Sequence, residues 1–144
     1  MTEDFLHYIW KFQNLNTVEL IGMKGERISV KSVGVLNQNA GPDFLNARLV
    51  IDDRDWAGNV EVHINSSDWY AHKHDLDKDY ESVILHVVYK YDKPVFLRDG
   101  SEIPVLELKL LIPEVVVSNY DRLMLETDWL SCRNSLSNID SFTL

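Results

Sequence analysis

Apolar side chains recur at helical spacing near the start of the chain and alternate with polar ones further along. Over residues 2–15 this pattern predicts a helix, with Thr2 as its N-terminal cap and acidic residues in its first turn. His7 and Lys11 lie off the apolar stripe, so we expect both side chains to face solvent. The stripe itself consists of Phe5, Leu6, Ile9 and Phe12, with Trp10 at its edge.

The middle of the chain has the pattern of strands. Alternation over Phe44–Ile51 predicts a half-buried strand whose apolar face carries Leu45, Ala47, Leu49 and Ile51. The nearly continuous apolar run Val83–Tyr89 predicts a central strand that is covered on both faces. The other expected strands are Val18–Gly22, Arg27–Val35 and Trp56–Ile64, followed by a hairpin over residues 94–112 around the Asp99-Gly100 turn.

A second helix is expected after this hairpin. Pro113 suits the first turn of a helix, and Glu114–Leu130 continues from it. Together these elements predict one α+β domain over residues 1–130, with a mixed, mainly antiparallel sheet, an N-terminal helix and a C-terminal helix. Residues 131–144 are polar and rich in serine, so we expect a flexible tail there.

Composition narrows the class of protein. The chain has 144 residues, of which 45% are hydrophobic and 26% charged, as in an ordinary globular domain. It has neither a secretory signal nor an apolar run near the roughly 20 residues that span a bilayer, so we expect a cytoplasmic protein. The single cysteine, Cys132, excludes an internal disulfide and a multi-cysteine zinc site. The net charge of −9 disfavours broad binding of nucleic acid, although carboxylates that bind divalent cations change sign locally.

Two neighbouring strands carry a first candidate site. Asp43 stands at the entrance of one strand, and Glu61 and His63 share a face of the next. Carboxylate oxygens on adjacent strands suit a hydrated Mg²⁺ ion. We therefore take Asp43, Glu61 and His63 as candidate catalytic residues, and Asp43 and Glu61 also as metal ligands.

The segments Gly-Pro-Asp-Phe (residues 41–44) and Val-Glu-Val-His (residues 60–63) resemble the PD-(D/E)xK nuclease core. The resemblance implies an acidic residue and a Glu-x-Lys on adjacent strands that hold Mg²⁺, with the lysine positioning or activating water. His63 stands where that family has lysine, and a histidine is mostly neutral at pH 7, so the positive charge is lost. On this hypothesis His63 orients water or acts as a general base.

A histidine-rich loop, residues 66–80, offers a second candidate site. His72 and His74 alternate along it and could direct two imidazoles at one ion, with Asp77 or His63 completing a zinc-like set. The predicted metal ligands are therefore Asp43, Glu61, His72, His74 and Asp77, and the metal is Mg²⁺ or Zn²⁺. The alternative is a solvated polar loop.

The same region leaves two further alternatives open. His86 lies inside an apolar strand, so it is either a hydrogen-bonded core histidine, which we favour, or part of a buried polar site. Aromatic residues of loop 66–80 could stack on a base or sugar, or pack at the rim of the sheet.

Longer stretches carry a resemblance to a whole family. LHYIWKF, NAGPDFLNA, WAGNVEVHINSSDWYAHKHD and YESVILHVVY are similar to the domain-of-unknown-function family 2851, a bacterial family met mainly in Bacteroidetes. The similarity covers about residues 3–110. It implies a bacterial, cytoplasmic protein and no particular activity. Members of that family are longer, so we expect this chain to correspond to their N-terminal part, without a C-terminal region.

Two functions follow from these patterns. The first is a metal-dependent, nuclease-like phosphodiesterase domain that uses Asp43, Glu61 and His63. The second is a non-enzymatic module that binds a protein or a glycan through the aromatic and histidine-rich loop 66–80. Convergence of the carboxylates and histidines on one place would favour the first.

Overall fold

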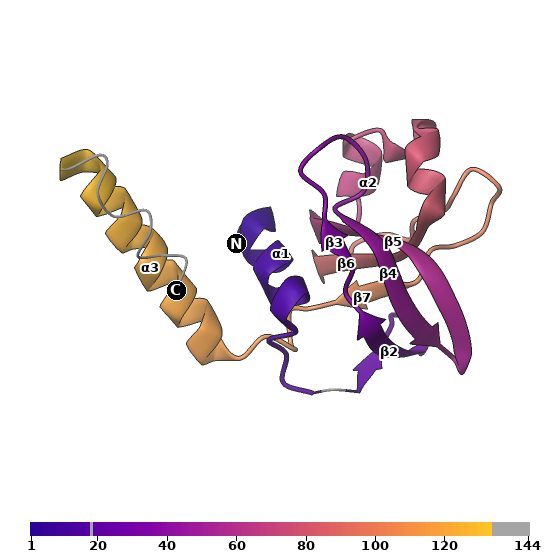
Figure 1. The fold of residues 1–144 in the computed structure, drawn as a ribbon, viewed down its shortest axis with the longest axis horizontal. Helices are drawn as coiled ribbons and strands as arrows, with labels where there is room; N and C mark the ends of the chain where they lie inside the picture. The colour runs from indigo at the N-terminus through magenta and orange to yellow at the C-terminus, as the bar shows by residue number, and fades with distance from the viewer. Residues whose placement is uncertain (18, 134–144) are drawn as a thin grey trace. The chain divides into compact units, whose positions relative to one another are not determined.

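The computed structural model describes residues 1–17 and 19–133, and it divides the chain into two compact units, Met1–Ile112 and Pro113–Leu144. The first unit combines an N-terminal helix with a curved sheet (Figure 1). Four pairings of strands in the described residues are antiparallel and two are parallel, so the predicted mixed, mainly antiparallel α+β fold is confirmed.

The sheet has seven strands in the order β1-β2-β4-β5-β6-β7, and β3 pairs with β4 outside this path. Burial alternates along parts of β2 and β4, whereas β5 and β6 each contain four consecutive buried residues. Their bounds are β1 Leu20–Ile21, β2 Arg27–Ser32, β3 Val35–Leu36, β4 Phe44–Ile51, β5 Arg54–Asn65, β6 Val83–Lys90 and β7 Val105–Glu107.

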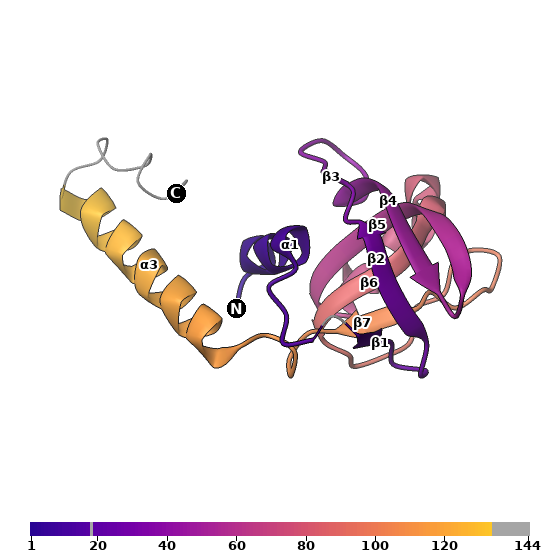
Figure 2. The same cartoon turned by 60° about the horizontal axis from the view of Figure 1, so that its bottom comes forward.

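The two ends of the sheet order meet each other. The backbone N–H of Met23, just after β1, donates to the carbonyl of Val105 at the start of β7, at 2.9 Å. Figure 2 shows β1 beside β7, so the sheet curls back on itself. This contact satisfies backbone groups that an open sheet would leave at its edges.

Helix α1 (Glu3–Phe12) begins as the sequence predicts, because the Thr2 hydroxyl accepts a hydrogen bond from the backbone N–H of Phe5. The predicted stripe is wrong at one residue. Phe12 is 57% exposed, whereas Trp10 is fully buried and its indole N–H donates to the carbonyl of Val33. The Trp10 side chain therefore connects α1 to the segment between β2 and β3 by a hydrogen bond.

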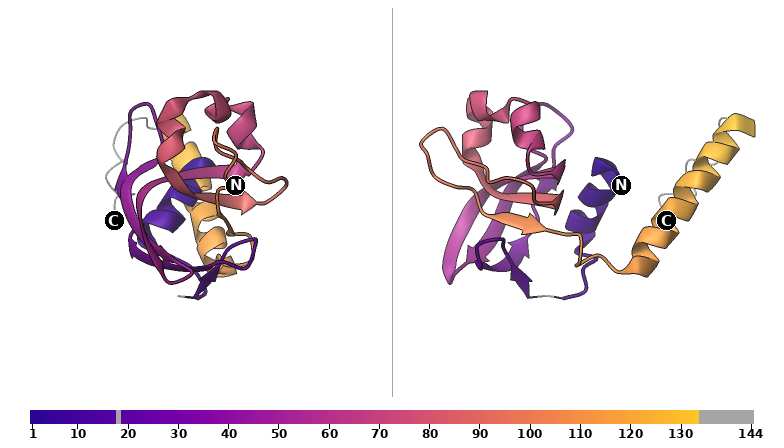
Figure 3. Two further views of the ribbon diagram at one scale, coloured as in Figure 1. Left: turned by 90° about the vertical axis from the view of Figure 1, so that its right-hand side faces the viewer. Right: turned by 180° about the vertical axis from the view of Figure 1, so that it is seen from behind.

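The connection between β5 and β6 crosses over through short helices, α2 (Asp68–Ala71), η1 (His74–Leu76) and η2 (Lys78–Ser82) (Figure 3). Its start is fixed by Asp92, whose carboxylate accepts from the hydroxyls of Ser66 and Ser67. A small apolar cluster anchors the rest, namely Trp69, Tyr80, Val83, Val95 and Ile103.

The predicted hairpin over residues 94–112 forms only up to Ile103. Around the Asp99-Gly100 turn, Phe96 forms an antiparallel bridge with Glu102, and the backbone N–H groups of Leu97 and Ile103 donate to the carbonyls of Ser101 and Val95. After Pro104 the chain instead forms β7, parallel to β6, and the backbone N–H of His86 donates to the Pro104 carbonyl. Proline has no N–H to continue a ladder, and the open edge of β6 offers an alternative partner.

The second unit contains helix α3 (Glu114–Arg133), which confirms the predicted helix 114–130 and extends it by three residues. Residues 134–144, most of the predicted tail, lie outside the described residues. Over the part of the chain that is described, no helix combines the length and apolarity needed to cross a bilayer.

Candidate metal site

Asp43 and Glu61 face each other at the start of the β4–β5 pair. Phe44 is paired with Val60, so the residue before Phe44 meets the residue after Val60. The backbone N–H of Asp43 donates to Glu61 Oε1 at 3.1 Å, and the N–H of Val62 donates to Asp43 Oδ2 at 2.9 Å. The two carboxylates therefore lie side by side, as the sequence hypothesis required.

A β-bulge brings Asp43 to this face of the sheet. The register changes by one residue between the pairs Phe44–Val60 and Ala47–Gly58, and Asn46 within it has a left-handed φ of 60°. With an unbroken register Asp43 would lie opposite Val62, on the other face from Glu61. The bulge also explains why Phe44 is buried in place of Leu45, which is only half-buried, contrary to the predicted apolar face.

Two histidines approach the second carboxylate oxygen of Glu61, and a third lies beside them. His74 Nε2 lies 2.7 Å from Glu61 Oε2, and His63 Nε2 lies 3.4 Å from the same oxygen. His63 Nε2 is also 3.2 Å from His72 Nδ1. One nitrogen from each of His63, His72 and His74 falls within 4.8 Å of the others, which is a spacing that could hold a metal ion.

These separations suit a tetrahedral ion. With Zn–N bonds of about 2.0–2.1 Å, ligand atoms around zinc lie roughly 3.3 Å apart. The contacts of His63 with His72 and with Glu61, at 3.2 and 3.4 Å, are already close to that edge length. His72 is exposed and His63 is buried, so the cluster is open to solvent on one side.

His86 supports the cluster from the neighbouring strand. It is paired with Glu61 across the parallel β5–β6 ladder and is fully buried. Its Nε2 lies 2.8 Å from His63 Nδ1, while its own Nδ1 has no hydrogen-bond partner among the described residues. His86 is thus buried in the core, as we favoured, and its contact with His63 also makes it part of a buried polar site, as the alternative expected.

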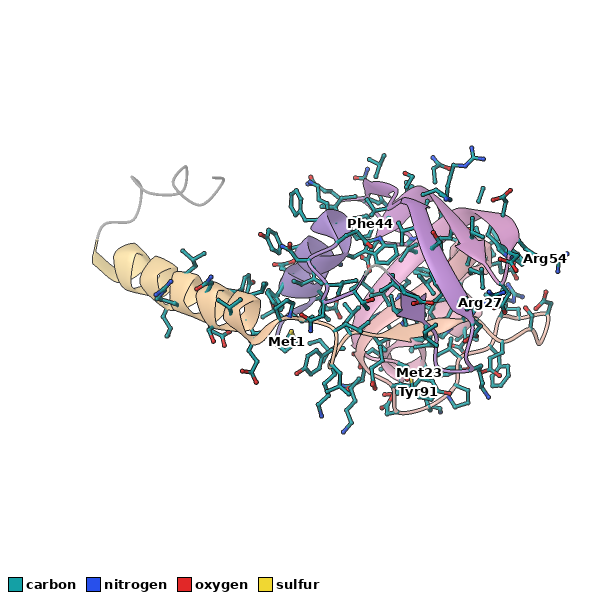
Figure 4. The ribbon with its side chains drawn as sticks, turned by 90° about the horizontal axis from the view of Figure 1, so that it is seen from below. Met1, Met23, Arg27, Phe44, Arg54 and Tyr91 are labelled. Carbon is teal, nitrogen blue, oxygen red and sulfur yellow. The ribbon has the colours of Figure 1, made fainter. Side chains whose placement is uncertain are left out.

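His7 is the residue that sequence reasoning missed, since it was expected to face solvent. Its side chain is 19% exposed, and Nε2 lies 3.4 Å from Asp43 Oδ2. The ring also meets Phe44 edge-on, beside α1 at the start of β4 (Figure 4). The spacing of Glu3 and His7 could have indicated that His7 faces the protein. Residues four apart lie on the same face of a helix, and both side chains are half-buried.

The remaining residues of loop 66–80 have other roles. Asp77 is exposed, and its Oδ1 accepts from the N–H of Asp79 to cap η2, so it lies outside the group of three histidines. Trp69 and Tyr80 are buried. The Tyr80 ring stacks on His74 with centroids 3.7 Å apart, and the Trp69 ring meets both of them edge-on, which fixes the His74 imidazole.

Burial controls the protonation of the carboxylates. Burial, together with neighbouring Asp43, raises the pKa of Glu61 to about 10. Burial also opposes ionisation of Asp43, but the contacts with His7 and Glu61 and the Val62 N–H outweigh it and hold the pKa of Asp43 below its usual value. Without a cation, the pair therefore holds one proton, on Glu61.

Burial keeps the imidazoles of His63 and His86 neutral at pH 7. Burial and the adjacent histidines lower the pKa of His63 to about 2, and burial lowers that of His86 to about 3. The pKa of His74 is lowered by burial and by His72. Burial also acts to lower the pKa of His7, but the contact with the Asp43 carboxylate outweighs it, so the pKa of His7 is raised. Neutral imidazoles beside an acidic pair present lone pairs to a cation.

The fold and the cluster define an α+β protein in which His63, His72 and His74, beside the carboxylates of Asp43 and Glu61, could hold a metal ion. The chain belongs to the family described as "Protein of unknown function (DUF2851)", whose model matches residues 3–144, a longer stretch than the motifs alone cover. No curated protein and no solved structure matches the chain.

Proposed function

We propose that this protein is a metal-dependent hydrolase of phosphodiesters, with a nuclease-like arrangement of its site. The observation that carries the proposal is the meeting of three imidazole nitrogens, from His63, His72 and His74, with the acidic pair Asp43 and Glu61. Imidazole ligands suit Zn²⁺ better than Mg²⁺, so we assign the site to Zn²⁺.

The order of elements supports the nuclease-like part of the proposal. An antiparallel strand pair, β4 and β5, carries the aspartate and the glutamate, and a helical crossover leads to β6, parallel to β5. This is the arrangement implied by the PD-(D/E)xK resemblance. His63 replaces the lysine of that pattern, and in the proposed site the bound dication is the source of positive charge.

Each residue has a distinct role in the proposed site. His63, His72 and His74 hold the ion, and Glu61 joins them through Oε2. A bound ion of this kind polarises a phosphoryl oxygen and lowers the pKa of bound water to about 7. Asp43, which stays ionised, accepts a proton from water, and exposed His72 marks the side from which substrate enters.

The alternative, a module that binds through exposed aromatic residues of loop 66–80, has lost its main support. Trp69 and Tyr80 are buried, and each packs against histidines of the cluster. The loop therefore contributes its aromatic rings to positioning His74 and His86, in keeping with a supporting role in the metal site.

Metal content is the first test. Protein purified without chelator should contain one Zn²⁺ per chain by elemental analysis, and the double variant His72→Ala/His74→Ala should contain none. Asp77→Asn is the matched control from the same loop, because an asparagine keeps the cap of η2, and its metal content should be unchanged. Equal metal content in the double variant would refute the assigned ligands.

Hydrolysis of bis(p-nitrophenyl) phosphate is the second test. The metal-loaded protein should cleave this diester, chelator should abolish cleavage, and Asp43→Asn should reduce kcat by about 100-fold, the usual scale for a lost general base. A protein that binds the metal with full occupancy yet cleaves no diester would refute the hydrolase while leaving the metal site intact.

A further inference from the structure

Helix α1 brings a histidine to the carboxylate of Asp43, the general base of the proposed hydrolase. His7 Nε2 lies 3.4 Å from Asp43 Oδ2, and the backbone N–H of Val62 donates to the same oxygen at 2.9 Å. One partner comes from the helix and the other from β5. Oδ2 is therefore approached from two separate elements, which together define how the carboxylate is turned.

The place of His7 is fixed by the packing of α1. The helix is anchored at Trp10, whose buried indole donates to the carbonyl of Val33. The His7 ring meets the Phe44 ring edge-on, with centroids 5.8 Å apart. Phe44 is fully buried and directly follows Asp43 in the chain, so the imidazole and the carboxylate are held together at the start of β4.

The Nε2 atom of His7 faces Asp43 without a competing partner. It is shielded from solvent, and within residues 1–17 and 19–133 it makes no hydrogen bond of ordinary geometry, so its contact there is the ion pair with Asp43. Contacts of catalytic groups are often long before substrate binds and shorten in the reactive complex. An approach of roughly 0.5 Å would make this contact a charge-assisted hydrogen bond.

A second contact is needed because a single donor does not fix a carboxylate. The terminal torsion of an aspartate is broad, so with the N–H of Val62 alone the Asp43 carboxylate could turn and still keep that hydrogen bond. A partner at His7 removes this freedom. The restriction matters for the reaction, because a displacement of about 1 Å from the reactive geometry can cost about 100-fold in rate.

We propose that His7 is a positioning residue, which holds Asp43 Oδ2 so that Oδ1 faces the attacking water. As the water oxygen bonds to phosphorus and the leaving oxygen departs with the electrons of its P–O bond, the proton of the water passes to Oδ1. His7 acts through Asp43 and touches neither the ion nor the substrate. The role rests on the proposed hydrolase, and it adds a residue of α1 to a site otherwise built from the sheet and the crossover.

Steady-state kinetics on bis(p-nitrophenyl) phosphate test this role in the Zn²⁺-loaded protein. His7→Leu, which fills the space without a donor, should lower kcat about tenfold or more, the scale of a lost supporting partner, and leave KM and Zn²⁺ content unchanged. His7→Gln should recover part of the loss, because its amide nitrogen can donate to Oδ2. Tyr8→Leu is the matched control, since Tyr8 is a 45% exposed aromatic residue of the same helix, and its kcat should be unchanged.

A double-mutant cycle separates positioning from a structural role. Because His7 acts only through Asp43, His7→Leu should lower kcat by less than about twofold when Asp43→Asn is already present. A general loosening of the fold would instead lower kcat by the same factor in both backgrounds. Equal factors, or an unchanged kcat for His7→Leu alone, would overturn the proposal.

NMR of the imidazole nitrogens gives a test that needs no hydrolysis. His7 Nε2 should carry a hydrogen at pH 7, and its chemical shift should change in Asp43→Asn but not in Tyr8→Leu. A His7 Nε2 without hydrogen, or a shift that does not respond to Asp43→Asn, would overturn the positioning role. If the Zn²⁺-loaded protein shows this Asp43-dependent hydrogen but cleaves no diester, the hydrolase alone is refuted and the contact of His7 with Asp43 is supported.

Discussion

His63 Nδ1 lies 2.8 Å from His86 Nε2, and both rings are buried. One of these nitrogens must carry the hydrogen that they share. If His63 Nδ1 carries it, His63 Nε2 is a free lone pair directed at His72 and Glu61, as a metal ligand requires. A metal ligand at His63 Nε2 therefore requires the shared hydrogen on His63 Nδ1, with His86 Nε2 as its acceptor.

The first prediction concerns this contact. Gln places a polar atom near the position of His Nε2, whereas Leu fills a similar volume without one. We therefore expect His86→Leu to weaken Zn²⁺ binding about 10- to 100-fold, the usual cost of a lost supporting partner, and His86→Gln to weaken it less. Competition with a chromogenic chelator measures both affinities. Equal losses in variants of equal melting temperature would contradict the role of the hydrogen bond.

The second prediction concerns protons released by metal binding. Glu61 is protonated at pH 7, because burial raises its pKa to about 10, whereas His63, with a pKa of about 2, has no proton to lose. Binding of Zn²⁺ at pH 7 should therefore release about one proton per ion. Calorimetric titrations in buffers with different ionisation enthalpies measure this number. Glu61→Gln should bring it close to zero, and an unchanged release would assign the proton to another group.

The third prediction is the pH dependence of stability without metal. The contribution of Glu61 is fully present below its unfolded pKa of 4.5 and is lost as pH rises toward about 10. His63 and His86 act in the opposite direction: their contribution is present above 6.5 and is lost as pH falls toward about 2 and 3. We therefore expect maximal stability near pH 6.5, with a loss of about 1.4 kcal/mol per pH unit on the alkaline side from Glu61.

Urea unfolding in EDTA between pH 5 and pH 9 checks this profile. Glu61→Gln should flatten the alkaline side, because glutamine cannot lose a proton, and should steepen the rise between pH 5 and 6.5, where Glu61 partly offsets the two histidines. Saturating Zn²⁺ should also flatten the alkaline side, since the ion replaces the proton. Stability that rises from pH 6.5 to pH 9 in the unmodified, metal-free protein would contradict the protonated state of Glu61.

Local patterns were enough to predict much of the fold. The strand Phe44–Ile51 and the helix that starts near Thr2 follow from short-range alternation and capping, and the structure confirms both. The proximity of Asp43 to Glu61 was predicted because they lie on adjacent strands, but the bulge that puts them on one face of the sheet was not predicted. Each of these inferences needs only the residues of one or two neighbouring elements.

Contacts between distant segments could not be read in the same way. The parallel pairing of β7 with β6 competes with a local hairpin that has a favourable Asp-Gly turn, and only the open edge of β6 decides between them. His7 approaches Asp43 because α1 packs against β5, which no local pattern encodes. The contact of His63 with His86 likewise depends on the register of two parallel strands joined by a long crossover.

The bulge at Asn46 joins the fold to the site and gives the last prediction. Asn46 adopts a left-handed φ of 60°, and its N–H donates to the side-chain oxygen of Asn59. Asparagine and glycine tolerate this conformation, whereas a β-branched residue does not. Asn46→Gly should therefore change the free energy of unfolding little, and Asn46→Val should reduce it by about 1–2 kcal/mol. Because the bulge sets Asp43 opposite Glu61, the valine variant should also lose diester hydrolysis under conditions in which it remains folded. A valine variant with full activity and unchanged stability would show that Asp43 reaches the site without the bulge.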